Sequence, residues 1–132
     1  MATYNAATYL EEQLESISLQ TRRPDELVIF DDGSTDRTLD ICSSFARSAK
    51  FPVEIRQNKT NLGFGDNFLT CAEACRGDWV FFCDQDDVWA VNKIEAVETA
   101  IAAAEDDLVL VFHNASVLVC RRMRDVLQSR FA

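Results

Sequence analysis

The sequence lacks several features that would assign it to a class of protein directly. No apolar run approaches the roughly 18 residues of a membrane-spanning helix, and no basic stretch followed by an apolar one predicts a signal peptide. The five cysteines include no C-x-x-C pair, and Cys71 and Cys75 share a predicted helix face, which suits neither a disulfide nor a zinc site. We therefore expect a cytoplasmic protein with reduced, mostly buried thiols.

Positive charge is also scarce, and it is distributed unevenly. The chain has 13 Lys and Arg against 22 Asp and Glu, a net charge of −9 that argues against a nucleic-acid partner. Residues 121–132 are the exception, with four Arg and one Asp. Apolar residues recur there at near-helical spacing, which predicts a helix that either packs on the domain or makes a peripheral contact with an anionic membrane surface. They are Met123, Val126, Leu127 and Phe131.

The length of 132 residues and the apolar content of 48% predict a single folded domain, residues 1–132, with a core of its own. Short apolar segments alternate with amphipathic ones, which predicts an α/β fold of three layers with a mostly parallel sheet between helices. Asn5 or Thr8 is the predicted cap of the first helix, and Ser34 or Thr35 that of the second. The strands are expected at residues 1–4, 27–30, 52–56, 79–83 and 108–112, with a sixth at 117–119, and the helices around 10–17, 39–45, 68–75 and 90–104.

Polar residues follow three of the predicted strands at the point where each strand ends. They are Thr3-Tyr4-Asn5, Asp31-Asp32 and the run from Asp84 to Asp87. The carboxyl ends of parallel strands meet at one edge of a sheet, where open α/β folds bind their ligands. We therefore expect one crevice to gather all three groups.

The run Asp84-Gln85-Asp86-Asp87 places three carboxylates directly after an apolar segment. Each close pair repels by roughly 1 to 4 kcal/mol at effective dielectric constants between those of water and a protein surface. A bound cation would remove this cost, and hard carboxylate oxygens suit Mg²⁺ or Mn²⁺, which commonly bridge to substrate phosphates. The pattern also fits a solvated acidic turn, because Asp is common in loops.

Four motifs occur in order along the chain, and together they resemble one enzyme family. They are Met1-Ala2-Thr3-Tyr4-Asn5, Asp31-Asp32-Gly33-Ser34-Thr35-Asp36, Asn61-Leu62-Gly63 with Asn67-Phe68, and Asp84-Gln85-Asp86-Asp87-Val88-Trp89. The set is similar to the donor-binding half of a family 2 glycosyltransferase with the Rossmann-like GT-A fold, in a subgroup of bacterial rhamnosyltransferases. The resemblance runs from the first residue to about Phe112, and it implies a domain that is incomplete at its C-terminus.

The resemblance implies nucleotide-binding roles for the residues that match the first two motifs. Thr3 and Tyr4, with Asn5 beside them, would line the pocket for the nucleotide base. Asp32, together with Asp31, would accept hydrogen bonds from the base. The donor would be a dTDP- or UDP-sugar.

The remaining motifs would serve the sugar diphosphate. Asp84 would meet the ribose, and Asp86 would bind Mg²⁺ or Mn²⁺ with Asp84 and Asp87 close by. The metal would stabilise the negative charge that a departing nucleoside diphosphate gains. The loop near the donor would be shaped by Asn61, Gly63 and Asn67.

The same resemblance implies the partners of the protein. The acceptor would be a glycan or a lipid-linked sugar of bacterial cell-surface polysaccharide synthesis, and transfer would invert the anomeric centre. The general base is expected beyond the end of the chain, so no catalytic residue is assigned and the chain is expected to transfer poorly alone. Self-association and a peripheral contact with the cytoplasmic face of the membrane are left open.

Two other interpretations explain part of the pattern. A phosphatase of the haloacid dehalogenase type would use Asp84 as the nucleophile that forms an aspartyl-phosphate. That motif belongs on the first strand of its fold, with a Lys well downstream, whereas three predicted strands precede Asp84 here and the one later Lys, Lys93, follows almost at once. The other interpretation is a nucleotide-binding module without catalytic activity.

Overall fold

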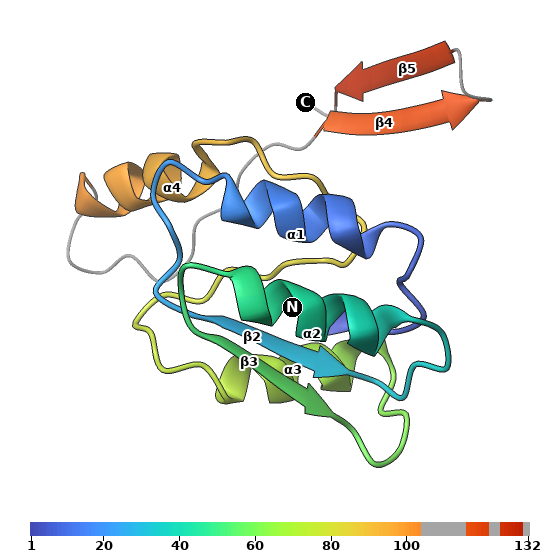
Figure 1. Ribbon diagram of the computed structural model, residues 1–132. Helices are drawn as coiled ribbons and strands as arrows, with labels where there is room; N and C mark the ends of the chain where they lie inside the picture. Colours follow the sequence, from blue (N-terminus) through green and yellow to red (C-terminus); the bar gives the residue numbers. More distant parts are fainter. Residues whose placement is uncertain (104–115, 122–124, 131–132) are drawn as a thin grey trace. The chain divides into compact units, whose positions relative to one another are not determined.

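The strand β2, Leu27–Asp31, is the centre of a three-stranded sheet of order β1-β2-β3, and Figure 1 shows β2 beside β3. Its apolar run is buried on both faces, because Leu27 and Ile29 pack in one cluster of the core while Val28 and Phe30 pack in another. The strands β1, Ala2–Thr3, and β3, Val53–Gln57, both pair with it in parallel. A parallel sheet with two apolar faces needs helices on each side.

The structure is a computed structural model that describes residues 1–103, 116–121 and 125–130. The chain divides into two units, residues 1–96 and 97–132. The first unit holds the sheet and three helices, α1 at Leu10–Ser18, α2 at Thr38–Ser48 and α3 at Phe64–Glu73. The helix α4, Lys93–Ala102, begins in the first unit, and the second contains β4, Ser116–Arg121, and β5, Asp125–Arg130.

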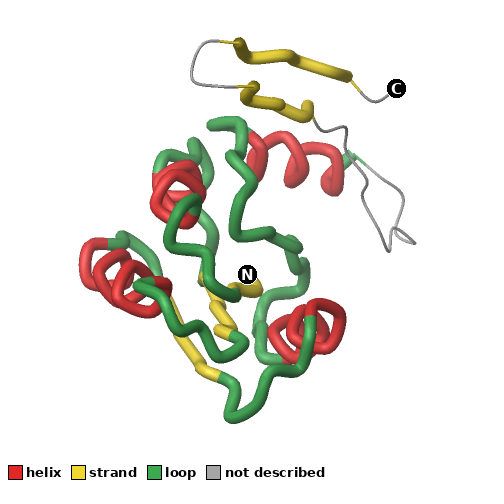
Figure 2. The backbone as a smooth tube through the Cα atoms, turned by 90° about the vertical axis from the view of Figure 1, so that its right-hand side faces the viewer, coloured by secondary structure: helices red, strands yellow, loops and turns green. Residues whose placement is uncertain are grey.

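The helices α1 and α2 lie on one side of the sheet and α3 lies on the other (Figures 1 and 2). Leu10, Leu14 and Ile17 of α1 recur every three or four positions, so they share one face, and all three are buried in the cluster that also contains Leu27 and Ile29. The opposite cluster is completed by a cysteine of α3. This arrangement confirms the predicted α/β class with a parallel sheet between helices.

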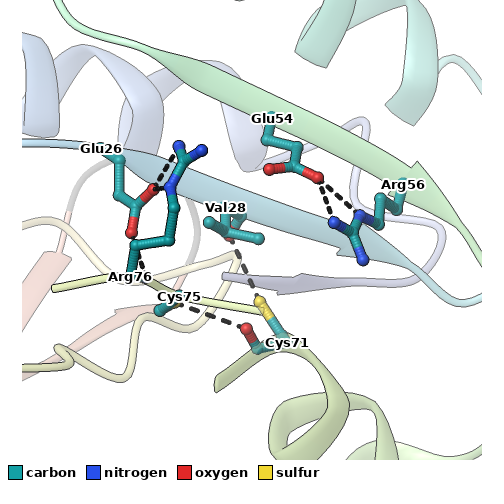
Figure 3. Close-up of polar contacts among 7 residues, drawn as sticks. All are labelled: Glu26, Val28, Glu54, Arg56, Cys71, Cys75 and Arg76. Carbon is teal, nitrogen blue, oxygen red and sulfur yellow. Dashed lines mark hydrogen bonds and ion pairs between the residues drawn. The ribbon is translucent and has the colours of Figure 1, made fainter. Parts of the chain in front are cut away.

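Polar contacts hold the end of α3 against the start of β2 (Figure 3). Arg76 donates from its backbone N–H to the Glu26 carboxylate at 2.6 Å and from its guanidinium to the same carboxylate at 2.7 Å. The Cys71 thiol donates to the Val28 carbonyl at 3.3 Å. The thiols at residues 42, 71, 75 and 83 are free, as the spacing of the cysteines predicts.

Residues 79–83 do not form the strand that their apolar run predicts. No helix or strand occurs between α3 and α4, and Trp79, Val80 and Phe82 are 40%, 40% and 60% exposed. The strand β1 is two residues long, so its free edge offers too few backbone N–H and C=O groups to pair a further five-residue strand. The prediction was wrong because an apolar run indicates a tendency to be buried and does not show that a partner strand is present.

In the second unit, β4 and β5 pair as an antiparallel hairpin. The strand β4 covers the predicted strand at 117–119. The predicted helical spacing is wrong for Val126 and Leu127, because both pair with residues of β4 in the hairpin and are therefore extended.

Several predicted features lie outside the described residues, namely the strand at 108–112 and the apolar residues Met123 and Phe131. Within residues 1–103, 116–121 and 125–130, the helices are too short, or not apolar enough, to cross a membrane.

Candidate functional site

The parallel register brings three segments of the chain to one edge of the sheet. Thr3 pairs with Asp31, and Asp31 pairs with Gln57, so the carboxyl ends of β1, β2 and β3 lie side by side. The loops that follow these strands therefore all begin at this edge, which is where parallel α/β sheets bind ligands.

The last residue of β1 and the residue after it contact both other predicted polar groups. Thr3 is 1% exposed, and its hydroxyl donates to the Asp31 carboxylate at 3.2 Å. The backbone N–H of Tyr4 donates to the side-chain oxygen of Gln85 at 2.7 Å, while the Tyr4 side chain is 49% exposed. The β1 end, the β2 end and the acidic run at Asp84–Asp87 are thus connected by direct hydrogen bonds.

The loop after β1 is also joined to the loop after β2. Asn5 adopts a left-handed backbone conformation, with φ at +48°, which Asn tolerates better than most residues. Its N–H donates to the Ser34 hydroxyl at 2.8 Å, and its side-chain oxygen accepts from the Thr35 N–H at 2.9 Å. These reciprocal contacts fix the two loops relative to each other.

The predicted helix caps, Thr8 among them, are wrong, and Asp36 serves both helices instead. α1 begins at Leu10 and α2 at Thr38, and neither has a side-chain cap from the residue before it. The Asp36 carboxylate accepts from the N–H of Ala7 at 3.0 Å and from that of Thr38 at 2.9 Å. The hydrogen bond from the Thr38 hydroxyl, more than any other contact, lowers the pKa of Asp36 below its ordinary value. Sequence reasoning missed Asp36 because a cap is sought a few residues away, whereas Ala7 lies 29 positions earlier.

Asp31 is fully buried, and its carboxylate is bonded within the protein. It accepts hydrogen bonds from the Gly33 N–H at 3.2 Å, the Ser34 N–H at 2.9 Å and the Gln57 side chain at 3.4 Å, as well as from the hydroxyls of Thr3 and Ser34. Gly33 has φ at +87°, a conformation that favours glycine. Asp31 therefore fixes the turn after β2, and its contact with a nucleotide base stays a prediction.

Asp32 is 3% exposed and faces the loop between β3 and α3. Its carboxylate accepts from the N–H groups of Leu62 and Gly63 at 2.8 Å and 2.9 Å and from the Asn58 side chain at 2.8 Å. Burial by itself would raise the pKa of Asp32, but these three hydrogen bonds outweigh it and hold the pKa below the ordinary value. The predicted contact of Asp32 with a base stays a prediction.

The third motif holds the β3–α3 loop against the end of β2. Asn61 donates to the Asp32 carbonyl at 3.0 Å and accepts from the Gly63 N–H at 3.1 Å. Asn67 is 2% exposed and donates to the Phe30 carbonyl at 3.1 Å. Gly63 has φ at +83°, so a side chain there would strain the turn.

The acidic run at residues 84–87, called the acidic loop below, contains one half-buried carboxylate and two exposed ones. Asp84 is partly buried, and Asp86 and Asp87 are exposed. Burial, together with the negative charges of Asp87 and Asp86, raises the pKa of Asp84 above its ordinary value of 3.8. The folded chain thus disfavours ionised Asp84, and a nearby cation would remove that penalty.

The carboxylates of the acidic loop suit a divalent cation whose other ligands come from a substrate. Within the part of the chain that the structure describes, no group of three or more His, Cys, Asp or Glu side chains is arranged to hold a metal ion. Mg²⁺ is commonly held by one or two carboxylates together with phosphate oxygens, because it retains water and dehydrates reluctantly. Asp86 and Asp87 are accessible for such a role, and Asp84 has a charge that a cation would stabilise.

The Asp84→Asn variant is expected to be more stable than the unsubstituted chain at pH 7 without metal. Because the folded-state pKa of Asp84 is raised, its ionisation costs stability as pH rises from 3.8 through the raised pKa, and the cost is complete above it. Thermal unfolding should therefore show a higher midpoint for Asp84→Asn at pH 7, and the difference should vanish below pH 3.8.

Asp78→Asn is the matched control, because Asp78 is exposed and precedes the acidic loop. Its unfolding midpoint should stay close to that of the unsubstituted chain at both pH values. A lower midpoint for Asp84→Asn than for Asp78→Asn at pH 7 would contradict the electrostatic account of the loop.

Most of the chain is similar to one protein family and to several curated proteins. Residues 1–129 match the family model described as "Glycosyl transferase family 2". The dTDP-rhamnosyl transferase RfbG of Shigella flexneri is 38% identical over 120 residues, which are 88% of this chain and 38% of RfbG. The abequosyltransferase RfbV of Salmonella typhimurium is 33% identical over 106 residues, which are 79% of this chain and 32% of RfbV. The chain spans about a third of the length of these relatives.

Solved structures of S. aureus TarS share the fold. TarS in complex with UDP is 31% identical with a TM-score of 0.70, over 76% of this chain and 30% of that chain. TarS in complex with UDP-GlcNAc gives the same identity and TM-score over 76% of this chain and 29% of that one. This likeness confirms the predicted GT-A class, and the family match extends over nearly the whole sequence. The chain therefore belongs to glycosyl transferase family 2.

Proposed function

We propose that the chain is the nucleotide-sugar-binding part of a glycosyltransferase, which moves a sugar from a dTDP- or UDP-sugar to a glycan or lipid-linked acceptor. The observation that carries this proposal is the meeting of three loops at one sheet edge, with Tyr4 bonded to Gln85 of the acidic loop and Asn5 bonded to Ser34. The names of relatives support the donor class, since RfbG is a dTDP-rhamnosyl transferase and TarS was solved with UDP and UDP-GlcNAc.

Tyr4 is the side chain best placed to meet the nucleotide base. Its ring is half exposed while its backbone is held by Gln85, so a base can stack on it without reordering the loop. Thr3 and Asp31 are buried below and would act by fixing this loop. Asp32 would offer the base a remaining lone pair of Oδ2, the oxygen that accepts from the Gly63 N–H.

Asp86 would hold Mg²⁺ or Mn²⁺ together with the donor diphosphate, and Asp84 and Asp87 would complete the negative site. When bound, the metal would act as a Lewis acid that stabilises the charge developing on the leaving nucleoside diphosphate. Without metal, the three carboxylates of the acidic loop would repel the donor diphosphate and weaken its binding.

The phosphatase alternative has less support. It requires Asp84 at the end of a strand within the sheet, and residues 79–83 form no strand. The family match over residues 1–129 also favours the transferase. A binding module without transfer activity is the second alternative, so binding and transfer are separate proposals.

We propose that the chain works in the cytoplasm, where it would contact a lipid-linked acceptor at the membrane face. Exposed aromatic side chains would favour such a contact or self-association. Phe64 and Phe82 are 75% and 60% exposed, and both rings contact that of Phe68.

Calorimetric titration of the chain with UDP, dTDP and GDP, each with and without Mn²⁺, tests the proposed function. We expect UDP or dTDP to bind with one site per chain, at least about tenfold more tightly with Mn²⁺, because the metal offsets the repulsion between diphosphate and the acidic loop. GDP should bind more weakly, because dTDP in the name of RfbG and UDP in the TarS complex are both pyrimidine nucleotides. Equal affinity for all three nucleotides regardless of metal would contradict the proposal.

A further inference from the structure

Three polar side chains of the α1 segment are buried where an apolar face is expected. Gln13, Ser16 and Gln20 are 0%, 7% and 5% exposed. Because they are three and four positions apart, they lie along one side of α1 and of the turn that follows it. The Ser16 hydroxyl lies 2.7 Å from the Gln13 carbonyl, and the Gln20 amide donates to the Ser16 carbonyl at 3.1 Å. They form one connected row, called the polar row below.

The polar row holds both ends of the acidic loop. The Gln13 amide donates to the Cys83 sulfur at 2.6 Å, and the Ser16 hydroxyl accepts from the Trp89 N–H at 3.1 Å. Cys83 directly precedes Asp84, and Trp89 follows Asp87 by two residues.

Gln20 extends the same support to the start of α4. Its amide donates to the Ala90 carbonyl at 2.7 Å, and its side-chain oxygen accepts from the Ile94 N–H at 3.1 Å. The neighbouring Thr21 N–H donates to the Val91 carbonyl at 2.8 Å. The chain from Cys83 to Ile94 is therefore bonded to α1 and the turn after it at both ends, in addition to the bond between the Tyr4 N–H and Gln85.

These bonds matter because the loop has no strand before it. In a sheet, the hydrogen bonds between strands would set the position of Asp84 along the fold, but residues 79–83 form no strand. An apolar face of α1 would bury the loop without fixing its register, since apolar contacts are not directional. A buried row of hydrogen-bonded polar groups favours one position of the loop. Any other position would leave buried polar groups unpaired, which costs free energy.

We propose that Gln13, Ser16 and Gln20 are positioning residues. They fix the position of the acidic-loop carboxylates relative to the carboxyl ends of β1, β2 and β3, where the nucleotide would bind. This inference rests on the proposed function, in which those carboxylates hold a metal–diphosphate. The polar row acts on the position of the loop through its hydrogen bonds to Cys83 and Trp89. Its role resembles that of the outer groups that orient metal ligands in other proteins.

The test compares Ser16→Ala, which removes the acceptor of the Trp89 N–H, with Ser18→Ala, the same change at an exposed position of α1. Gln20→Met is the second variant, because it removes the bonds to Ala90 and Ile94 and keeps the length of the side chain. Each full chain is titrated with UDP, with and without Mn²⁺, at a temperature where circular dichroism shows it folded.

We expect Ser16→Ala and Gln20→Met to weaken Mn²⁺-dependent binding of UDP by about tenfold or more, as outer groups of metal sites do. Binding without Mn²⁺ should change by less than about twofold, because the row bonds to the two ends of the acidic loop and to the start of α4. Amide hydrogen exchange at Trp89 should be faster in Ser16→Ala and unchanged in Ser18→Ala.

Equal Mn²⁺-dependent affinities of Ser16→Ala and Ser18→Ala would overturn the positioning role and leave the proposed function intact. An equal loss of affinity with and without Mn²⁺ would overturn it too, because a general structural defect would then be responsible. Absence of Mn²⁺-dependent binding in the unsubstituted chain would overturn the proposed function and the positioning role together.

Discussion

In the presence of Mn²⁺, the Asp86→Ala chain is expected to bind UDP about 100-fold more weakly than the unsubstituted chain, since loss of a direct ligand costs more than loss of an outer group. Asp86 is exposed, so the substitution should leave the fold nearly unchanged. Without Mn²⁺ the expected effect has the opposite sign. Removal of one of three clustered negative charges reduces the repulsion of a diphosphate, so binding should be equal or tighter.

Titration calorimetry under the two conditions measures this change of sign. Asp78→Ala is the matched control, because it removes the same charge from an exposed position before the loop. It should leave Mn²⁺-dependent binding within about twofold of the unsubstituted chain, since an exposed charge outside the site contributes little. If Asp86→Ala and Asp78→Ala bind UDP–Mn²⁺ equally, Asp86 is not the metal ligand.

The Asp31→Ala chain is expected to lose about 4 kcal/mol of unfolding free energy at pH 7, because buried and partly buried donors lose a charged acceptor. These donors include the N–H groups of Gly33 and Ser34 and the hydroxyl of Thr3, and Asp31 itself is 0% exposed. Typical domains have only about 5 to 15 kcal/mol in total, so the variant should be partly unfolded under mild conditions. Urea unfolding followed by circular dichroism measures the loss.

Asp31→Asn separates the charge from the shape of the side chain. It keeps one oxygen for Thr3 and Ser34 but turns an NH₂ group toward the N–H groups of Gly33 and Ser34, so a loss of about 2 kcal/mol is expected. Asp78→Ala, exposed and outside the turn, should change stability by less than about 0.5 kcal/mol. A loss below about 1 kcal/mol for Asp31→Ala would show that water or neighbouring groups satisfy the donors.

Much of the fold could be predicted from local patterns of apolar residues. The run Leu27 to Phe30 is buried on both faces because consecutive apolar side chains of a strand point to opposite sides. Leu10, Leu14 and Ile17 share one face of α1 because of the helical repeat. The order of strands and helices then implies parallel pairing, which brings Thr3 and Asp31 to the same edge.

Other features depended on partners that are distant in the chain. Residues 79–83 have the composition of a buried strand, but a strand needs backbone groups of a neighbour, and β1 is too short to supply them. Asp32 follows a strand end as a ligand-binding carboxylate would, yet its oxygens accept from Leu62 and Gly63, 30 and 31 positions later. Gln13 and Cys83 meet across 70 positions.

The sequence by itself determined the fold class, the sheet edge at which the polar groups gather, and membership of glycosyl transferase family 2. Local periodicity and ordered motifs suffice for these, because they depend on which side chains avoid water and on residues close together in the chain. Only the tertiary structure decided which donors the carboxylates of Asp31 and Asp32 accept from, and which helix holds the acidic loop. A hydrogen bond requires two groups within about 3 Å in the right orientation, and for segments far apart in sequence only the folded chain sets that distance.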